Sequence, residues 1–165
     1  MYPTAAVLAQ IDVSVGGDPA GTLGSGAGSA FLTTLVVGAV LVAIAPAYVE
    51  ARMADALEDP VGNLVYGVAA LLVLAVLIVA LVLSIVGILA VIPLFVAAYA
   101  VWAVGSTVGF LAIADRLIDR DGEWALALVV AAGLNGALVL TGVGGLGSLV
   151  VGAMGFGAVL SDWLE

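Results

Sequence analysis

The chain of 165 residues contains no cysteine, no histidine and no lysine. These absences exclude disulfides, thiol nucleophiles, imidazole bases and the usual zinc and copper ligand sets. Three arginines face twelve acidic residues, and the formal net charge is −9. Such a balance repels the phosphates of nucleic acids. We therefore expect no catalytic chemistry, no cofactor and no binding of nucleic acid.

Charge of either sign is scarce. Charged residues make up 9% of the chain, against about 25% in typical soluble domains. Hydrophobic residues make up 65%, and the mean hydropathy is +1.36. This composition predicts an integral membrane protein in contact with membrane lipid. The acidic, lysine-free charge balance is typical of proteins from halophilic archaea, and a cation site is the alternative interpretation.

Long uncharged runs divide the chain, because a spanning helix needs about 20 apolar residues. The glycine-rich stretch Gly21–Ser29 favours a flexible lead-in over residues 1–29, followed by a helical transmembrane domain over residues 30–165. The predicted fold is all-α, a polytopic helical membrane protein with about five transmembrane helices, or four plus a re-entrant segment. The predicted spans are Ala30–Val49, Leu64–Leu83, Leu94–Ala114, Trp124–Leu140 and Gly145–Asp162.

A charged segment, Tyr48–Asn63, separates the first two spans. Val49, Met53 and Leu57 recur at helical spacing, opposite charged positions that include Arg52. This pattern predicts a short amphipathic helix at the membrane interface. Pro60 and Gly62 should end it, and Asn63 should cap the next span.

The uncharged run from Pro60 to Ala114 has 55 residues and must reverse without a polar loop. We expect the reversal at Ser84–Pro93. Gly87 allows a backbone bend, and Pro93 lacks an N–H and suits the first turn of a helix. A packed hairpin turn and a re-entrant segment both fit these residues.

Polar side chains within the predicted spans are few and uncharged. Asn135 is the strongest candidate among them, because an amide in hydrocarbon needs a partner; an interhelical hydrogen bond is favoured over a substrate contact. Gly105 and Gly109 form a GxxxG pair that supports close helix packing, within one chain or between subunits. The hydroxyl candidates are Thr33, Thr34, Ser84, Ser106 and Thr107.

Orientation follows from the three arginines, Arg52, Arg116 and Arg120. With five spans all three fall on one side, and positively charged loops favour the cytoplasm. The N-terminus is then predicted outside and the C-terminus inside the cell.

The order of prolines and glycines resembles that of the integral membrane domain associated with bactofilin-like, polymer-forming proteins, of the haloarchaeal type. The matching outline runs from about Phe31 to the C-terminus. It consists of Pro46, Pro60, Gly67, Gly87 and Pro93. The resemblance implies a helical membrane domain without catalytic residues.

The leading functional hypothesis is a small membrane scaffold or anchor that assembles partners or itself by helix packing. One alternative is an oligomeric channel or carrier for a small solute or ion, with Asn135, the hydroxyls and the turn Ser84–Pro93, including Gly87, along its path. Another is an accessory subunit of a larger membrane complex, including a viral one.

Overall fold

The computed structural model describes residues 19–84, 87–118, 123–142 and 144–161, and six α-helices form the regular structure in these ranges. The all-α prediction is confirmed: four long apolar helices are candidate membrane spans, and one shorter apolar helix accompanies them. The orientation of the spans stays a prediction. Residues 1–18 of the expected lead-in, Arg120 and the end of the last expected span at Asp162 lie outside the described residues. The helices are α2 (Pro19–Ile44), α3 (Pro46–Glu58), α4 (Pro60–Val82), α5 (Gly87–Ile118), α6 (Trp124–Leu140) and α7 (Gly144–Ser161).

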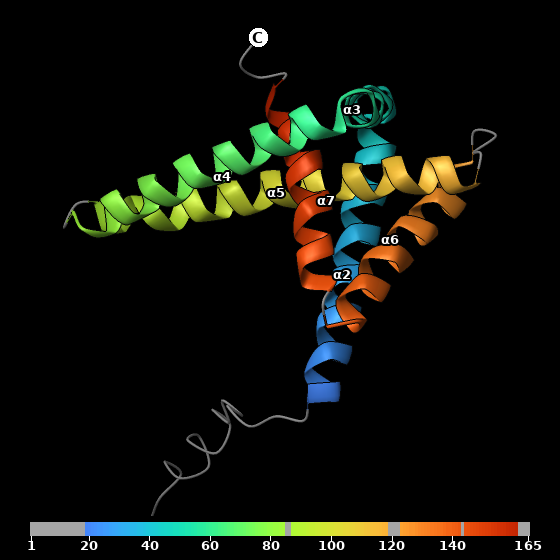
Figure 1. Ribbon diagram of the computed structural model, residues 1–165, viewed down its shortest axis with the longest axis horizontal. Helices are drawn as coiled ribbons and strands as arrows, with labels where there is room; N and C mark the ends of the chain where they lie inside the picture. The colour runs from blue at the N-terminus through green and yellow to red at the C-terminus, as the bar shows by residue number, and fades with distance from the viewer. Residues whose placement is uncertain (1–18, 85–86, 119–122, 143, 162–165) are drawn as a thin grey trace, which may run out of the picture.

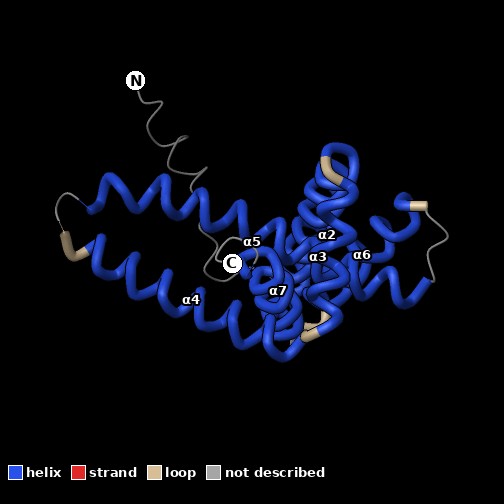
Figure 2. The backbone as a smooth tube through the Cα atoms, turned by 90° about the horizontal axis from the view of Figure 1, so that it is seen from above, coloured by secondary structure: helices blue, strands red, loops and turns tan. Residues whose placement is uncertain are grey.

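The helices run in two crossing directions (Figure 1). The α4–α5 hairpin projects from one side of the molecule, and α2 and α7 run crosswise to it. Helix α6 lies on the side opposite the hairpin tip in both views (Figure 2). The molecule therefore has a helical body and one projecting hairpin arm.

Helix α2 begins at Pro19, well before the expected start at Ala30. The glycine-rich stretch Gly21–Ser29, expected to be flexible, is helical in the structure. The stretch packs on α6 through Ala27, which is buried, and a Cβ added to Gly136 of α6 would lie 3.2 Å from the Ala27 carbonyl oxygen. Tertiary packing here outweighs the low helix propensity of glycine.

Two proline corners turn the chain from α2 through α3 into α4. Ala45 precedes Pro46 with φ −144° and ψ 61°, and Asp59 precedes Pro60 with φ −132° and ψ 74°. A residue before proline is disfavoured in the helical region, so each helix stops there and a new one begins at the proline. The first span therefore ends at Ile44, not at the predicted Val49.

The amphipathic segment forms α3, and Val49 and Met53 on its apolar side are buried. The expected capping residue is wrong. Asp59 caps α4, since its Oδ1 accepts a hydrogen bond from the Gly62 N–H at 2.9 Å. Asn63 instead donates from Nδ2 to the Asp55 carbonyl oxygen at 2.8 Å, which ties α4 to the last turn of α3.

The reversal between α4 and α5 is shorter than predicted. Helix α4 ends at Val82 and α5 starts at Gly87, so Pro93 lies inside α5 rather than at its first turn. Proline in a helix interior removes one backbone hydrogen bond, and membrane helices tolerate this loss when local adjustments satisfy the freed group. The 32 residues of α5 make it about 48 Å long, longer than a hydrocarbon core of about 30 Å.

Gly87→Leu is expected to destabilise the hairpin, because a Cβ at Gly87 would overlap the Leu81 carbonyl oxygen. We expect a loss of about 1–3 kcal/mol in the free energy of unfolding, measured by thermal circular dichroism in detergent. Ser84→Ala is the control. It removes only the long 3.4 Å hydrogen bond from the Gly87 N–H to Ser84 Oγ and should cost less than about 0.5 kcal/mol. Equal losses in the two variants would contradict the tight turn.

The core lies around the second half of α5. Nine residues of α5 are buried, eight of them between Gly105 and Ala114. Against this stretch pack Val49 and Met53 of α3 and Ala131 of α6. Helix α5 thus serves both as one arm of the hairpin and as the centre of the body.

Candidate functional site

A hydrogen-bonded cluster centred on Asn135 joins three helices inside the apolar body. Asn135 Nδ2 donates to Thr34 Oγ1 of α2 at 2.8 Å, and Ser148 Oγ of α7 donates to Asn135 Oδ1 at 3.0 Å. Asn135 and Thr34 are 8% and 3% exposed. The interhelical hydrogen bond that the sequence favours for Asn135 is therefore present.

Asn135 and Thr34 also border a polar pocket of about 230 Å³ between α2, α5 and α6. Each of α2 and α5 contributes five residues at positions i, i+3, i+4, i+7 and i+8, which is one face of a helix. Seven of the eleven lining residues carry a hydroxyl or an amide. These seven are Ser29, Thr33, Thr34, Tyr99, Ser106, Thr107 and Asn135.

The lining of this polar pocket contains no Asp, Glu, Lys or Arg. Among the described residues, no group of three or more His, Cys, Asp or Glu side chains is placed to hold a metal ion. Two aromatic residues, Tyr99 and Trp102, complete the wall contributed by α5. The pocket therefore offers neutral hydrogen-bonding groups beside aromatic rings.

Helix α7 packs between the bases of α4 and α5 through backbone contacts. A Cβ added to Gly155 would overlap the Gly105 carbonyl oxygen of α5 and lie 2.9 Å from the Gly109 nitrogen. A Cβ added to Gly157 would overlap the Asn63 carbonyl oxygen of α4 and lie 3.0 Å from the Gly67 nitrogen. Helix α7 therefore lies between the bases of α4 and α5.

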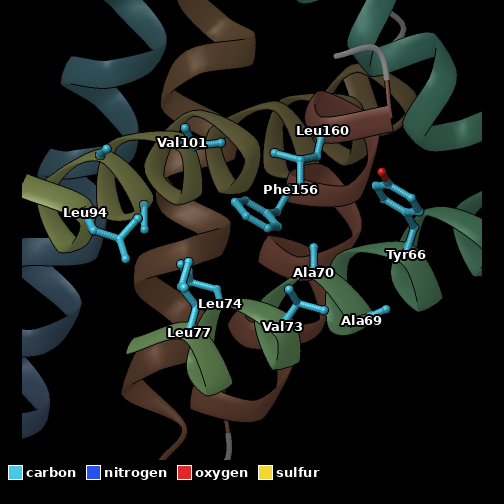
Figure 3. A pocket seen from close by; sticks show the side chains of 12 residues that line it. Tyr66, Ala69, Ala70, Val73, Leu74, Leu77, Leu94, Val101, Phe156 and Leu160 are labelled. Atoms are coloured by element: carbon cyan, nitrogen blue, oxygen red, sulfur yellow. The ribbon is translucent and has the colours of Figure 1, made fainter. Parts of the chain in front are cut away.

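An apolar groove of about 500 Å³ lies between α4 and α5 beside α7 (Figure 3). The Phe156 ring projects from α7 between the two arms. Four alanines line the groove, two on each arm, together with larger apolar residues and Tyr66. The alanines are Ala69 and Ala70 of α4 and Ala97 and Ala98 of α5.

Arg52 links α3 to the C-terminal turn of α7. Its Nη1 donates to the Ala158 carbonyl oxygen at 3.3 Å and lies 3.0 Å from Asp55 Oδ2. Its guanidinium also lies 5.8 Å from the centroid of the Tyr48 ring. A cation at a helix C-terminus is favourable, since the last carbonyls carry partial negative charge. The sequence pattern placed Arg52 on the solvated side of the amphipathic helix, whereas its side chain is only 14% exposed.

The structure separates the residues expected along a polar path. Ser84 and Gly87 lie at the hairpin tip, on the opposite side of the body from α6, which carries Asn135 (Figure 1). Gly105 and Gly109 pack against α7. Pro93 is exposed on the outer part of α5. Among the expected polar residues, Asn135 and four hydroxyl residues share one pocket. Sequence reasoning missed Ser29, Tyr99 and Trp102, although their helical spacing from the expected hydroxyls was a usable signal.

The four candidate spans and the buried polar cluster define a helical integral membrane protein. Residues 3–165 match the family model described as Domain of unknown function (DUF8173), and the chain belongs to that family. That description carries no link to bactofilin-like proteins, so the resemblance to their membrane domain stays a prediction. No curated protein and no solved structure matches the chain.

Proposed function

We propose that the protein is a membrane scaffold that assembles with further copies of itself through the α4–α5 hairpin. The observation that carries this proposal is the apolar groove between the two arms. The groove continues the space between α4 and α5 that α7 fills at the base of the hairpin. The proposed occupant of the groove is one helix of the hairpin of a second copy.

The arrangement of residues along the arms supports a helical occupant. Gly67 of α4 contacts α7, and Ala70 and Leu74 continue the same helix face outward into the groove. On α5 the face of Gly105 continues at Val101 and Ala98. Because α7 lies between the bases of the two arms and alanines line both walls of the groove, a second helix can approach closely.

A second copy also suits the lack of charge on this surface. The hairpin from Pro60 to Ala114 contains no charged residue, and its outer arm surfaces expose large apolar residues such as Val76 and Phe95. In a dimer with two-fold symmetry the two copies use the same surface. One arm of each hairpin then lies in the groove of the other copy, and both grooves are filled. Partner segments with charged side chains would bury those charges at a cost.

Filling the groove is expected to weaken self-association. In vesicles of defined lipid content, energy transfer between labelled copies should show association that falls on dilution with lipid. Ala98→Phe or Ala70→Phe should raise the dissociation constant about tenfold or more, because overpacking costs about 1–3 kcal/mol and about 1.4 kcal/mol is one factor of ten. Val129→Phe on the exposed side of α6 is the matched control.

Two results would contradict the proposal. A protein that stays monomeric at every dilution has its groove filled by lipid chains rather than by a second copy. Association that Ala98→Phe and Val129→Phe change equally would place the contact elsewhere.

A further inference from the structure

The polar pocket between α2, α5 and α6 contains hydrogen-bonding capacity that the described residues do not use. Ser29, Thr33 and Ser106 line it, and their hydroxyls form no hydrogen bond with another described residue. An Asn amide has two N–H donors and two acceptor lone pairs, and Asn135 uses one of each, with Thr34 and Ser148. The pocket therefore contains both hydrogen-bond donors and hydrogen-bond acceptors that a ligand could use.

The neutral lining decides the charge of the ligand. No lining residue has an ionised side chain, and bringing an unpaired ion into an apolar helical body is costly. An apolar molecule fits poorly as well, because it would leave the hydroxyls without partners. A neutral ligand that both donates and accepts hydrogen bonds matches the pocket.

The two aromatic residues of the pocket narrow the chemical class of the ligand further. Tyr99 and Trp102 border the pocket beside the hydroxyls. The Trp102 ring is held in place, since it packs on Phe156 at a centroid distance of 5.9 Å and against Gly152. A carbon skeleton with one hydroxyl per carbon presents C–H groups to a ring and O–H groups to Ser, Thr and Asn at the same time.

We propose that this pocket binds a neutral polyhydroxyl group, either a free polyol or the sugar headgroup of a lipid. The volume of about 230 Å³ is below the range of about 300–1,000 Å³ for drug-sized ligands, in keeping with a group of a few carbons. This binding site is independent of the groove between α4 and α5 and of the scaffold function.

Trp102 supplies the reporter for the test. The chain has three tryptophans, so Trp124→Phe combined with Trp163→Phe leaves Trp102 alone. This protein in detergent is titrated with glycerol, erythritol and myo-inositol while the Trp102 fluorescence is recorded. In a second arm it is reconstituted in phosphatidylcholine vesicles with rising fractions of a galactosyl diacylglycerol.

The expected result is a saturable change in fluorescence in at least one arm. Ser106→Ala and Thr33→Ala should each raise the dissociation constant about threefold to tenfold, the effect of one lost hydrogen bond. Both variants should keep the helical circular dichroism, since neither hydroxyl bonds a described residue. Thr141→Ala, whose hydroxyl donates to Leu138 outside the pocket, should change nothing.

The two arms separate the sources of the ligand. Saturation by a free polyol identifies a soluble ligand, and saturation by the galactolipid alone identifies a headgroup. A linear response that Ser106→Ala and Thr33→Ala leave unchanged means that the pocket holds only water, and the proposal falls. A saturable response to KCl or NaCl that these variants weaken would overturn the neutral ligand class.

Discussion

Gly155→Leu is expected to separate α7 from α5 and to prevent stable folding. The Cβ of any side chain at this position would overlap the Gly105 carbonyl oxygen, which is backbone and cannot move aside alone. We expect the free energy of unfolding to fall by at least about 3 kcal/mol, the upper end of the usual overpacking cost. Thermal circular dichroism and the yield of monodisperse protein in detergent measure this effect.

The same helix provides the control. Gly145 is exposed and has no heavy atom within 4 Å of an added Cβ. Gly145→Leu should therefore leave the stability unchanged or raise it by up to about 1 kcal/mol, because leucine is a better helix former than glycine. If Gly155→Leu and Gly145→Leu melt at the same temperature, α7 does not pack between α4 and α5 as described.

Asn135→Leu is expected to weaken the junction of α2, α6 and α7. Leucine has the same branched shape and the same number of side-chain heavy atoms, but it removes the donor to Thr34 and the acceptor for Ser148. Interhelical hydrogen bonds of this kind contribute about 0.6 kcal/mol each on average and up to about 1.7 kcal/mol. The two together predict a loss of about 1–3 kcal/mol, measured by unfolding in detergent.

A double-mutant cycle isolates the bond to Ser148. Asn135→Leu combined with Ser148→Ala should cost less than the sum of the two single losses, because both remove the same interaction. Thr141→Val is the control: its exposed hydroxyl bonds only its own helix, and the change should stay within about 0.5 kcal/mol. Additive losses for Asn135 and Ser148 would show that the cluster does not hold α6 to α7.

Several boundaries could be read from local sequence. Helix α6 spans Trp124–Leu140 as predicted, between a polar loop and the glycines that follow. The end of α4 at Val82 lies one residue from the predicted Leu83. Run length, charge and the positions of proline and glycine are local quantities, so they predict where such helices stop.

Other features depended on contacts between distant segments. The glycine-rich stretch before Ala30 is helical and packs through Ala27 on Gly136 of α6. Pro93 lies within a helix that a local rule would start at that residue. The amphipathic pattern of α3 places Arg52 on the solvated side of that helix. In the structure Arg52 donates a hydrogen bond to the carbonyl oxygen of Ala158, 106 residues away. The periodicity of residues within one segment does not show which distant segment it will contact.

The sequence by itself determined the class of this protein: a helical membrane chain with no charge in the run from Pro60 to Ala114 and few polar groups in its spans. Only the tertiary structure decided which faces meet. The spans are apolar on nearly every side, so hydrophobic periodicity does not orient them, and close packing of small residues has to do so. That packing sets α7 between α4 and α5, which opens the groove. It also brings hydroxyls from α2 and α5 beside Asn135, which forms the polar pocket.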